Sequence, residues 1–288
     1  MSCFDSSRLH NKTAIVTGAS AGIGAATAIL FAKAGSNVIL VARREDALKK
    51  VQEECVKAHR EAGVEAGGKY ATVTLDLSDR DQIAHFWEKV PESLREVDIL
   101  VNNAGFVLGW EHVGDVADDD VEKMFSINVF GLIAMTQFLV KEFKARNSGH
   151  IINIGSIGSR EPYAGGGIYT ATKHAVKAFT VSVYSRLLIE MTLRVFLQSS
   201  LMRELVDTRI RVSEVQPGLV DTELALIRFR GDKDAIAKMY EWLEPLNGQD
   251  VAEDIVWVAS RPAHVNIAEV FVLPTSQASV TIKRRPGE

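Results

Sequence analysis

Three side chains whose types suit proton transfer lie within residues 156–173, which read SIGSREPYAGGGIYTATK. Tyr169 and Lys173 are four residues apart, so on a helix they would share one face, about one turn apart. A tyrosine ordinarily ionises near pH ~10, and a nearby positive charge lowers that pKa. A phenol tuned in this way exchanges a proton with an alcohol or carbonyl oxygen, and Ser156 could hydrogen-bond to the same oxygen. The stretch therefore predicts alcohol or carbonyl chemistry.

Pairs of tyrosine and lysine at this spacing also arise by chance, and the chemistry needs a separate source of hydride. Residues 13–16 form an apolar run typical of a strand, TGASAGIG follows it, and a helical stretch ends at Gly35. Gly18, Gly22 and Gly24 stand between strand and helix, where glycines let the backbone approach a pyrophosphate. The helix N-terminus adds N–H groups and partial positive charge. The turn predicts a dinucleotide site.

Strand-like apolar runs alternate with helical stretches along the rest of the chain. The further predicted strands are residues 37–41, 71–75, 97–101, 150–154, 210–215 and 270–273. A long polar helix is predicted at 44–62, with Gly63 just past its end. This alternation predicts an α/β fold with a doubly wound parallel sheet of about seven strands, covered by helices on both faces. Without an evident linker, we expect a single domain spanning residues 1–288.

The turn after the second predicted strand bears on which dinucleotide is bound. A carboxylate there would bind the ribose 2′-hydroxyl of NAD, whereas an arginine accommodates the 2′-phosphate of NADP. The strand is followed by Arg43 and Arg44, and the acids that come next suit the start of a helix. The pattern favours NADP, and its alternative is a pair of arginines that simply face solvent.

Polar and turn residues follow the later predicted strands. Asn103 belongs to NNAG, directly after the fourth strand, and Pro217 and Gly218 follow the sixth. Ligands of open parallel sheets bind at the carboxyl ends of the strands, so these turns are expected to border the site. Thr222 could bond the carboxamide of a nicotinamide. Asn128 lies in the apolar stretch MFSINVFGL. It could serve the site, or its side chain could simply hydrogen-bond to the backbone.

Composition narrows the class of protein. The 288 residues carry a net charge of −4 and the pI is about 6.0, which argues against nucleic acid as the main partner. Cys3 and Cys55 provide neither a disulfide framework nor a metal cluster. The first residues lack the apolar core of a secretory signal, and no run reaches the ~18 apolar residues of a membrane span. We therefore expect a cytoplasmic protein with no membrane partner and no metal.

Together these motifs resemble those of the short-chain dehydrogenase/reductase family over nearly the whole chain. TGASAGIG resembles the family's cofactor turn, and NNAG resembles the motif after its fourth strand. Asn128, Ser156, Tyr169 and Lys173 are similar to its catalytic tetrad. The resemblance implies a Rossmann-type fold in which Tyr169 is the acid/base and Ser156 polarises the substrate oxygen. Lys173 would lower the pKa of Tyr169 and bind the nicotinamide ribose, and Asn128 would hold a water of a proton relay.

The resemblance also implies cofactor contacts and assembly. Asp76 would contact the adenine, and Ser20 with Arg43 would bind the 2′-phosphate. The full set of expected NADP-binding residues is Gly18, Ser20, Gly22, Ile23, Gly24, Arg43, Arg44, Asp76, Asn103, Tyr169, Lys173, Pro217, Gly218, Val220 and Thr222. A homotetramer or homodimer is implied by the family alone.

The C-terminal part is similar to one group of this family, the NADP-dependent 3-hydroxy acid dehydrogenases, on the segments PGLVDTELALIRFRGD and SRPAHVNIAEVFVLPTSQAS. This similarity implies a small 3-hydroxy acid as substrate, such as L-serine or L-allo-threonine. Such a substrate carries a carboxylate, so a cation is expected near the site. The candidates for this cation are Arg160, Arg228 and Arg230. The alternative for each is that it is a surface residue in contact with solvent. Residues 225–246 are expected to form a loop that covers the substrate.

Residues 181–198 depart from the family pattern. In the family, the helix of the tyrosine and lysine continues directly into a Ser-Leu-x-x-Glu-Leu segment, but here VSVYSRLLIEMTLRVFLQ intervenes. As straight helix the insertion would add about 27 Å, so we expect it to loop out or to displace the end of the helix. A retained intron is one hypothesis for its origin, because Val-Ser codons can match a splice donor and a Gln codon an acceptor. A true inserted helix is the other.

The sequence thus predicts an oxidoreductase that transfers a hydride between NADP(H) and a small 3-hydroxy acid. A reductase of neutral ketones or aldehydes would use the same residues and is the first alternative. A dinucleotide-binding protein that has lost turnover because of the insertion is the second.

Overall fold

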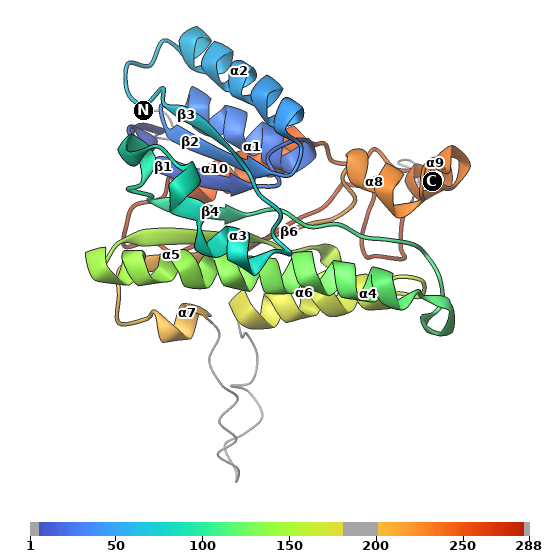
Figure 1. Ribbon diagram of the computed structural model, residues 1–288. Helices are drawn as coiled ribbons and strands as arrows, with labels where there is room; N and C mark the ends of the chain where they lie inside the picture. The colour runs from blue at the N-terminus through green and yellow to red at the C-terminus, as the bar shows by residue number, and fades with distance from the viewer. Residues whose placement is uncertain (1–5, 181–200, 285–288) are drawn as a thin grey trace, which may run out of the picture.

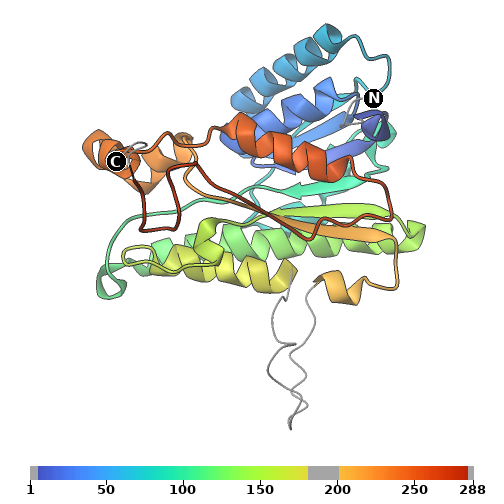
Figure 2. The ribbon, with the colours of Figure 1, turned by 180° about the vertical axis from the view of Figure 1, so that it is seen from behind.

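The computed structural model describes residues 6–180 and 201–284, which form a sheet between two layers of helices (Figures 1 and 2). Seven parallel strands pair in the order β3-β2-β1-β4-β5-β6-β7. They are β1 (Thr13–Thr17), β2 (Asn37–Ala42), β3 (Tyr70–Thr74), β4 (Ile99–Asn102), β5 (Gly149–Ile154), β6 (Ile210–Pro217) and β7 (Glu269–Val272). The predicted doubly wound parallel sheet is confirmed. Strand order reverses between β1 and β4, and ligands of such sheets bind at this switch point.

Helices cover both faces of the sheet (Figure 1). They are α1 (Gly22–Lys33), α2 (Glu45–Ala62), α3 (Arg80–Ala84), α4 (Asp118–Phe125), α5 (Leu132–Arg146), α6 (Gly167–Thr180), α7 (Leu201–Glu204), α8 (Glu223–Arg228), α9 (Lys233–Tyr240) and α10 (Gly248–Ala259). The layer of α1, α2 and α10 lies on one face, and α4, α5 and α6 lie on the other. The insertion expected at 181–198 lies outside the described residues.

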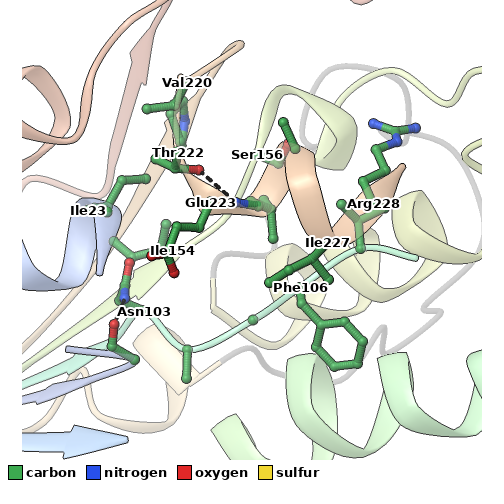
Figure 3. A pocket seen from close by; sticks show the side chains of 18 of the residues that line it. Ile23, Asn103, Phe106, Ile154, Ser156, Val220, Thr222, Glu223, Ile227 and Arg228 are labelled. Carbon is green, nitrogen blue, oxygen red and sulfur yellow. Dashed lines mark hydrogen bonds between the residues drawn. The ribbon is translucent and has the colours of Figure 1, made fainter. Parts of the chain in front are cut away.

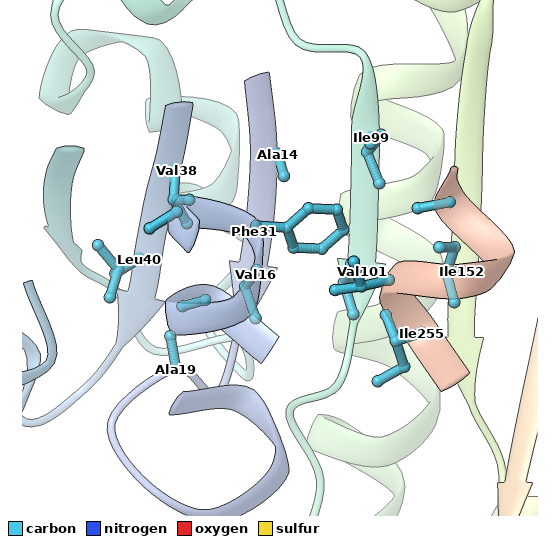
Figure 4. Packing of buried hydrophobic residues seen from close by; sticks show 14 of the residues in the cluster. Ala14, Val16, Ala19, Phe31, Val38, Leu40, Ile99, Val101, Ile152 and Ile255 are labelled. Atoms are coloured by element: carbon cyan, nitrogen blue, oxygen red, sulfur yellow. The ribbon is translucent and has the colours of Figure 1, made fainter. Parts of the chain in front are cut away.

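The two faces of the sheet carry separate apolar clusters because strand side chains alternate in direction. Val16 of β1 points to the first face, where it joins Phe31 of α1 and Ile255 of α10 (Figure 4). Its neighbour Ile15 points to the second face and joins Met135 of α5. Burial on both faces explains why the strands are almost continuously apolar rather than alternating.

A π-helical turn, Ser126–Gly131, joins α4 to α5. The continuous helical stretch Asp118–Arg146 is long and apolar enough, by composition, to cross a membrane. Met135, Leu139 and Phe143 of this stretch are buried against the sheet, whereas Phe130 is exposed. The hydropathy of this stretch therefore reflects a core helix. The π-helical turn matters for the site, because such turns often occur where a helix presents a functional residue.

His150 of β5 makes the stability of the fold sensitive to acid. Its side chain is fully buried, its Nε2 lies 2.9 Å from the Ser213 hydroxyl, and its Nδ1 has no partner among the described residues. Burial, reinforced by the charge of Arg211, lowers the pKa of His150 well below its ordinary value. Below pH ~6.5 the unfolded chain binds a proton at this residue that the folded chain does not.

We therefore expect stability to be lost as pH falls below ~6.5, by up to about 1.4 kcal/mol per pH unit from His150 alone. Urea unfolding between pH 7 and pH 5 measures this slope. The His150→Gln variant is the matched control, because glutamine does not titrate in this range. Its stability is expected to fall less steeply with acid than that of the wild type. Equal slopes in the two proteins would contradict the assignment.

Candidate active site

A cavity of about 460 Å³ opens at the carboxyl ends of the central strands. Its lining comes from the segments that follow β1 to β6, together with α8, α9 and the C-terminal segment. Figure 3 shows Ile23 and Asn103 on one side of this pocket, Ser156 in the middle and Arg228 on the other side. Residues predicted from separate motifs therefore share one cavity at the switch point of the sheet.

Ser156, Tyr169 and Lys173 meet in this cavity, as the sequence predicted. Ser156 follows β5 directly and caps a short 3₁₀ turn, where its Oγ accepts a hydrogen bond from the Gly158 N–H at 3.0 Å. Tyr169 and Lys173 both lie in the first half of α6. The Lys173 Nζ donates to the Ile154 carbonyl at 2.8 Å and lies 5.9 Å from the centre of the Tyr169 ring.

Burial dominates the ionisation of these groups. It raises the pKa of Tyr169, while hydrogen bonding with Ser156 and the positive charge of Arg228 act in the opposite direction. Burial also lowers the pKa of Lys173 to about 8, against the influence of Glu214. The pKa of Tyr169 is therefore raised overall, whereas the sequence predicted that Lys173 would lower it. The reason is that removing the phenolate from water destabilises it by more than Ser156 and Arg228 stabilise it.

Asn128 connects two walls of the cavity. It lies in the π-helical turn and is fully buried. Its Oδ1 accepts from the Phe106 N–H at 2.9 Å, and its Nδ2 donates to the Phe106 carbonyl at 2.8 Å and to the Thr172 Oγ1 at 3.1 Å. The side chain therefore holds the loop after β4 against α6. The expected role in holding a water stays a prediction.

The glycine turn has the shape that a pyrophosphate needs. Gly18 and Gly22 have φ of 66° and 55°, the left-handed region that favours glycine. A Cβ on Gly24 would lie only 2.3 Å from the Gly18 carbonyl oxygen, so only glycine lets α1 approach β1 this closely. The α1 N-cap residue, Ala21, offers no side-chain cap. The first N–H groups of α1 are therefore left for an anion.

The two arginines after β2 have different contacts. The Arg44 guanidinium lies 3.1 Å from the Ser20 Oγ and 2.8 Å from a Glu223 carboxylate oxygen, whereas Arg43 lies 4.0 Å from Asp76. The family resemblance implied that Ser20 and Arg43 bind the 2′-phosphate, which stays a prediction, and in the structure Ser20 is hydrogen-bonded to Arg44. Both arginines line the cavity and fit a 2′-phosphate.

Replacing Glu223 by glutamine is expected to tighten NADP⁺ binding by about 2- to 5-fold, the usual value of an exposed ion pair. Glu223 holds Arg44 in the free protein and would compete with the 2′-phosphate for it. NAD⁺ is the control ligand, because it lacks that phosphate and its affinity should hardly change. Calorimetric titration with NADP⁺ and with NAD⁺ measures both affinities. An equal gain for the two cofactors would contradict the competition.

The remaining expected cofactor residues also lie at the cavity. Asn103 donates from its Nδ2 to the Thr17 carbonyl at 2.8 Å, which ties the turn after β4 to β1. Thr222 caps α8 by accepting from the Leu224 N–H at 3.3 Å, as the dashed line in Figure 3 marks. The other predicted residues that line the cavity are Ile23, Asp76, Pro217, Gly218 and Val220.

The three candidate arginines are separated by their surroundings. Arg160 bonds to Gln216 and forms an ion pair with Glu269. Arg230 forms an ion pair with Asp120 at 2.7 Å and is largely exposed. Arg228 alone of the three lines the cavity.

Residues 225–246 are not one loop. They contain most of α8 and all of α9, and Ala225, Ile227, Met239 and Tyr240 from this segment line the cavity. Sequence reasoning also missed two aromatic residues of the lining, Trp110 and Tyr163. Both lie in segments that follow strands on the ligand side, which was the available signal.

Comparisons with known proteins agree with this geometry. A family model described as short chain dehydrogenase matches residues 12–196. An NADP-dependent 3-hydroxy acid dehydrogenase of Schizosaccharomyces pombe is 39% identical over 272 residues, which is 94% of this chain and 95% of that protein. A protein of Salmonella typhi with the same description, YdfG, is 37% identical over 265 residues, with 92% and 95% covered. A solved structure, the closed form of serine dehydrogenase complexed with NADP⁺, superposes with a TM-score of 0.80 at 34% identity, covering 94% of this chain and 98% of its own.

Proposed function

The chain belongs to the short-chain dehydrogenase family, and from this premise we propose that it oxidises small 3-hydroxy acids such as L-serine or L-allo-threonine. It is an NADP-dependent oxidoreductase that acts on CH–OH groups. NADP⁺ supplies the hydride acceptor. What the chain itself contributes is a proton acceptor, a hydrogen bond for the substrate oxygen and a binding site for the acid.

The observation that carries the proposal is the shared position of Ser156 and Tyr169 in the cavity that the glycine turn also lines. In the oxidising direction, the Tyr169 phenolate accepts the proton of the substrate hydroxyl while Ser156 hydrogen-bonds to the same oxygen. Lys173 is buried beside Tyr169, and the charge of Arg228 favours the phenolate. Relatives described as 3-hydroxy acid dehydrogenases support the substrate class.

The direct test is NADPH formation, followed by absorbance, with the purified protein and NADP⁺. The panel holds L-serine, L-allo-threonine, 3-hydroxypropionate and a neutral secondary alcohol, with NAD⁺ in parallel. Turnover of the acids with NADP⁺ is the expected result. Turnover of the neutral alcohol without the acids would contradict the proposal.

Reduction of neutral ketones or aldehydes is the second candidate function. Phe106, Trp110 and Ile227 give the substrate end of the cavity apolar walls, which favour an uncharged substrate. Activity on a panel of ketones with NADPH, set beside the oxidation of the acids, decides between the two functions.

Four further features are part of the proposal and rest on the sequence and the family resemblance. We place the chain in the cytoplasm, as a homodimer or homotetramer in which each chain forms one oxidoreductase domain. Light scattering after size exclusion tests the assembly. Residues 181–198 are proposed to be an insertion relative to the family. The substrate panel, repeated on a chain without these residues, shows whether activity tolerates them.

A further inference from the structure

Arg228, the last residue of α8, is a buried cation at the substrate end of the cavity. Its exposed fraction is 7%, and it lines the cavity together with Tyr169 and Ser156. Its Nε and Nη2 have no hydrogen-bond partner within the described residues. A buried charge that lacks a partner is costly, so this group needs an explanation beyond packing.

Aromatic rings from three segments hold the guanidinium in place. Its central carbon lies 4.2 Å from the Trp110 ring centre, 5.4 Å from that of Tyr163 and 5.6 Å from that of Phe229. The Arg228 carbonyl also accepts from the Gly109 N–H at 3.0 Å, which joins α8 to the loop that carries Trp110. Rings attract a cation without neutralising it. The arrangement therefore holds the charge in place, with Nε and Nη2 shielded from water and unpaired among the described residues.

The other cations near this end of the cavity already have oxygen partners. Arg160 and Arg230 are paired with carboxylates. Lys283 lines the cavity, but its Nζ donates to the Met239 carbonyl at 2.6 Å. Arg228 also interacts with the Tyr163 hydroxyl, but among these four cations it is the one with two buried donors, Nε and Nη2, that have no partner within the described residues.

The two unpartnered atoms of Arg228 lie on the same edge of the guanidinium, because Nη2 is the terminal nitrogen on the Nε–H side. Two parallel N–H donors match the two oxygens of a carboxylate. We propose that Arg228 binds the carboxylate of the substrate through Nε and Nη2, and that it thereby determines the preference for small hydroxy acids over neutral alcohols. This inference rests on the proposed function and names the group that recognises its substrate class.

The position of Arg228 relative to the reacting groups fits a short substrate. In a 3-hydroxy acid, one carbon separates the carboxylate carbon from the carbon that bears the hydroxyl. The binding cation must therefore lie near Tyr169. Arg228 and Tyr169 line the same cavity, and the charge of Arg228 acts to lower the pKa of Tyr169 against the effect of burial. Figure 3 shows Ile227, the neighbour of Arg228 on α8, facing the middle of the pocket beside Phe106.

The kinetic test compares 3-hydroxypropionate with 3-hydroxypropionamide, which has the same reacting alcohol but no charge. In Arg228→Met, kcat/KM with NADP⁺ is expected to fall about 100-fold or more for the acid, as for loss of a buried charge pair. For the amide it should stay within about 3-fold at the plateau of the pH profile. That retained amide activity also shows that the variant is folded. An equal loss on both substrates would overturn the inference, because it would indicate a structural role.

Two other variants sharpen the comparison. Arg230→Met removes an arginine two residues away that is paired with Asp120, and it should leave the acid-to-amide ratio unchanged. Arg228→Lys keeps the charge but offers only a point contact, so it should recover part of the acid activity. The Arg228→Met pH profile on the amide should also shift to higher pH, because the phenolate of Tyr169 loses a favourable charge. A ratio that Arg230→Met lowers as much as Arg228→Met does would overturn the inference.

A binding measurement separates this inference from the proposed function. Calorimetry of the protein with NADPH and propionate, which cannot react, should show binding to the wild type and at least about 10-fold weaker binding to Arg228→Met. Propionate binding that depends on Arg228, without oxidation of any acid in the panel, would support the carboxylate site and overturn the proposed function. If the protein oxidises the acids and Arg228→Met binds propionate as the wild type does, the proposed function would be supported and the carboxylate site overturned.

Discussion

Replacing Tyr169 by phenylalanine is expected to lower kcat/KM for the hydroxy acid by about 10²- to 10⁴-fold, the usual contribution of a general acid/base. The change removes one oxygen from a partly buried ring and leaves the packing of the ring in place. Ser156 can still hydrogen-bond to the substrate but is a poor proton acceptor. Steady-state NADPH formation measures the loss, and NADPH fluorescence should show a far smaller change in cofactor affinity.

Tyr70→Phe is the matched control for this prediction. Tyr70 lies in β3, away from the cavity, and its hydroxyl is buried without a partner among the described residues. The same loss of one oxygen there should leave kcat/KM unchanged and stability equal or higher. A Tyr169→Phe enzyme that keeps its rate within a few-fold of the wild type would show that another group takes the proton.

Replacing Gly24 by alanine is expected to cost more in cofactor binding than any other single methyl group in the glycine turn. The new Cβ would lie 2.3 Å from the Gly18 carbonyl oxygen and 2.5 Å from the Asn103 Nδ2. Backbone cannot rotate away as a flexible side chain does, so α1 must move from β1. A shift of this kind costs about 1–3 kcal/mol, and it displaces the helix N-terminus from its anion.

We expect NADP⁺ affinity to fall about 10- to 100-fold in Gly24→Ala, with a lower midpoint of thermal unfolding. Calorimetric titration and a thermal melt measure the two effects. Gly114→Ala is the control, because nothing lies within 4 Å of a Cβ at that position. It should bind the cofactor normally. Normal NADP⁺ binding by Gly24→Ala would mean that the turn adapts and is not the rigid cradle described above.

Much of the fold was accessible from local patterns. Continuous apolar runs such as that of β1 predicted buried parallel strands, because both faces of the sheet are covered by helices. The strand, glycine turn and helix around Gly18 are consecutive in the chain, so spacing alone indicated their role. Residues 225–246 were predicted as one loop, although they contain α8 and α9. Short helices of this kind depend on packing more than on their own sequence.

The sequence by itself determined the parts of the site that follow from neighbours in the chain. Tyr169 and Lys173 share a helix face because of their spacing, and the arginines after β2 favoured NADP because strand and turn are contiguous. The pKa of Tyr169, in contrast, was decided by the tertiary structure. Tyr169 lies beside Lys173 as predicted, yet burial by the surrounding segments raises its pKa, and no local pattern reports how far water is excluded.

Only the tertiary structure distinguished the candidate arginines. Arg160 forms an ion pair with Glu269, and Arg230 forms one with Asp120. Each partner is more than a hundred residues away in the chain. Arg228 instead lies against Trp110, and its Nε and Nη2 have no carboxylate partner within residues 6–180 and 201–284. The three arginines look alike in sequence, because the sequence does not show which carboxylates the fold places next to each guanidinium. That partner comes from another element of the chain, and it decides which arginine keeps its donors for a ligand.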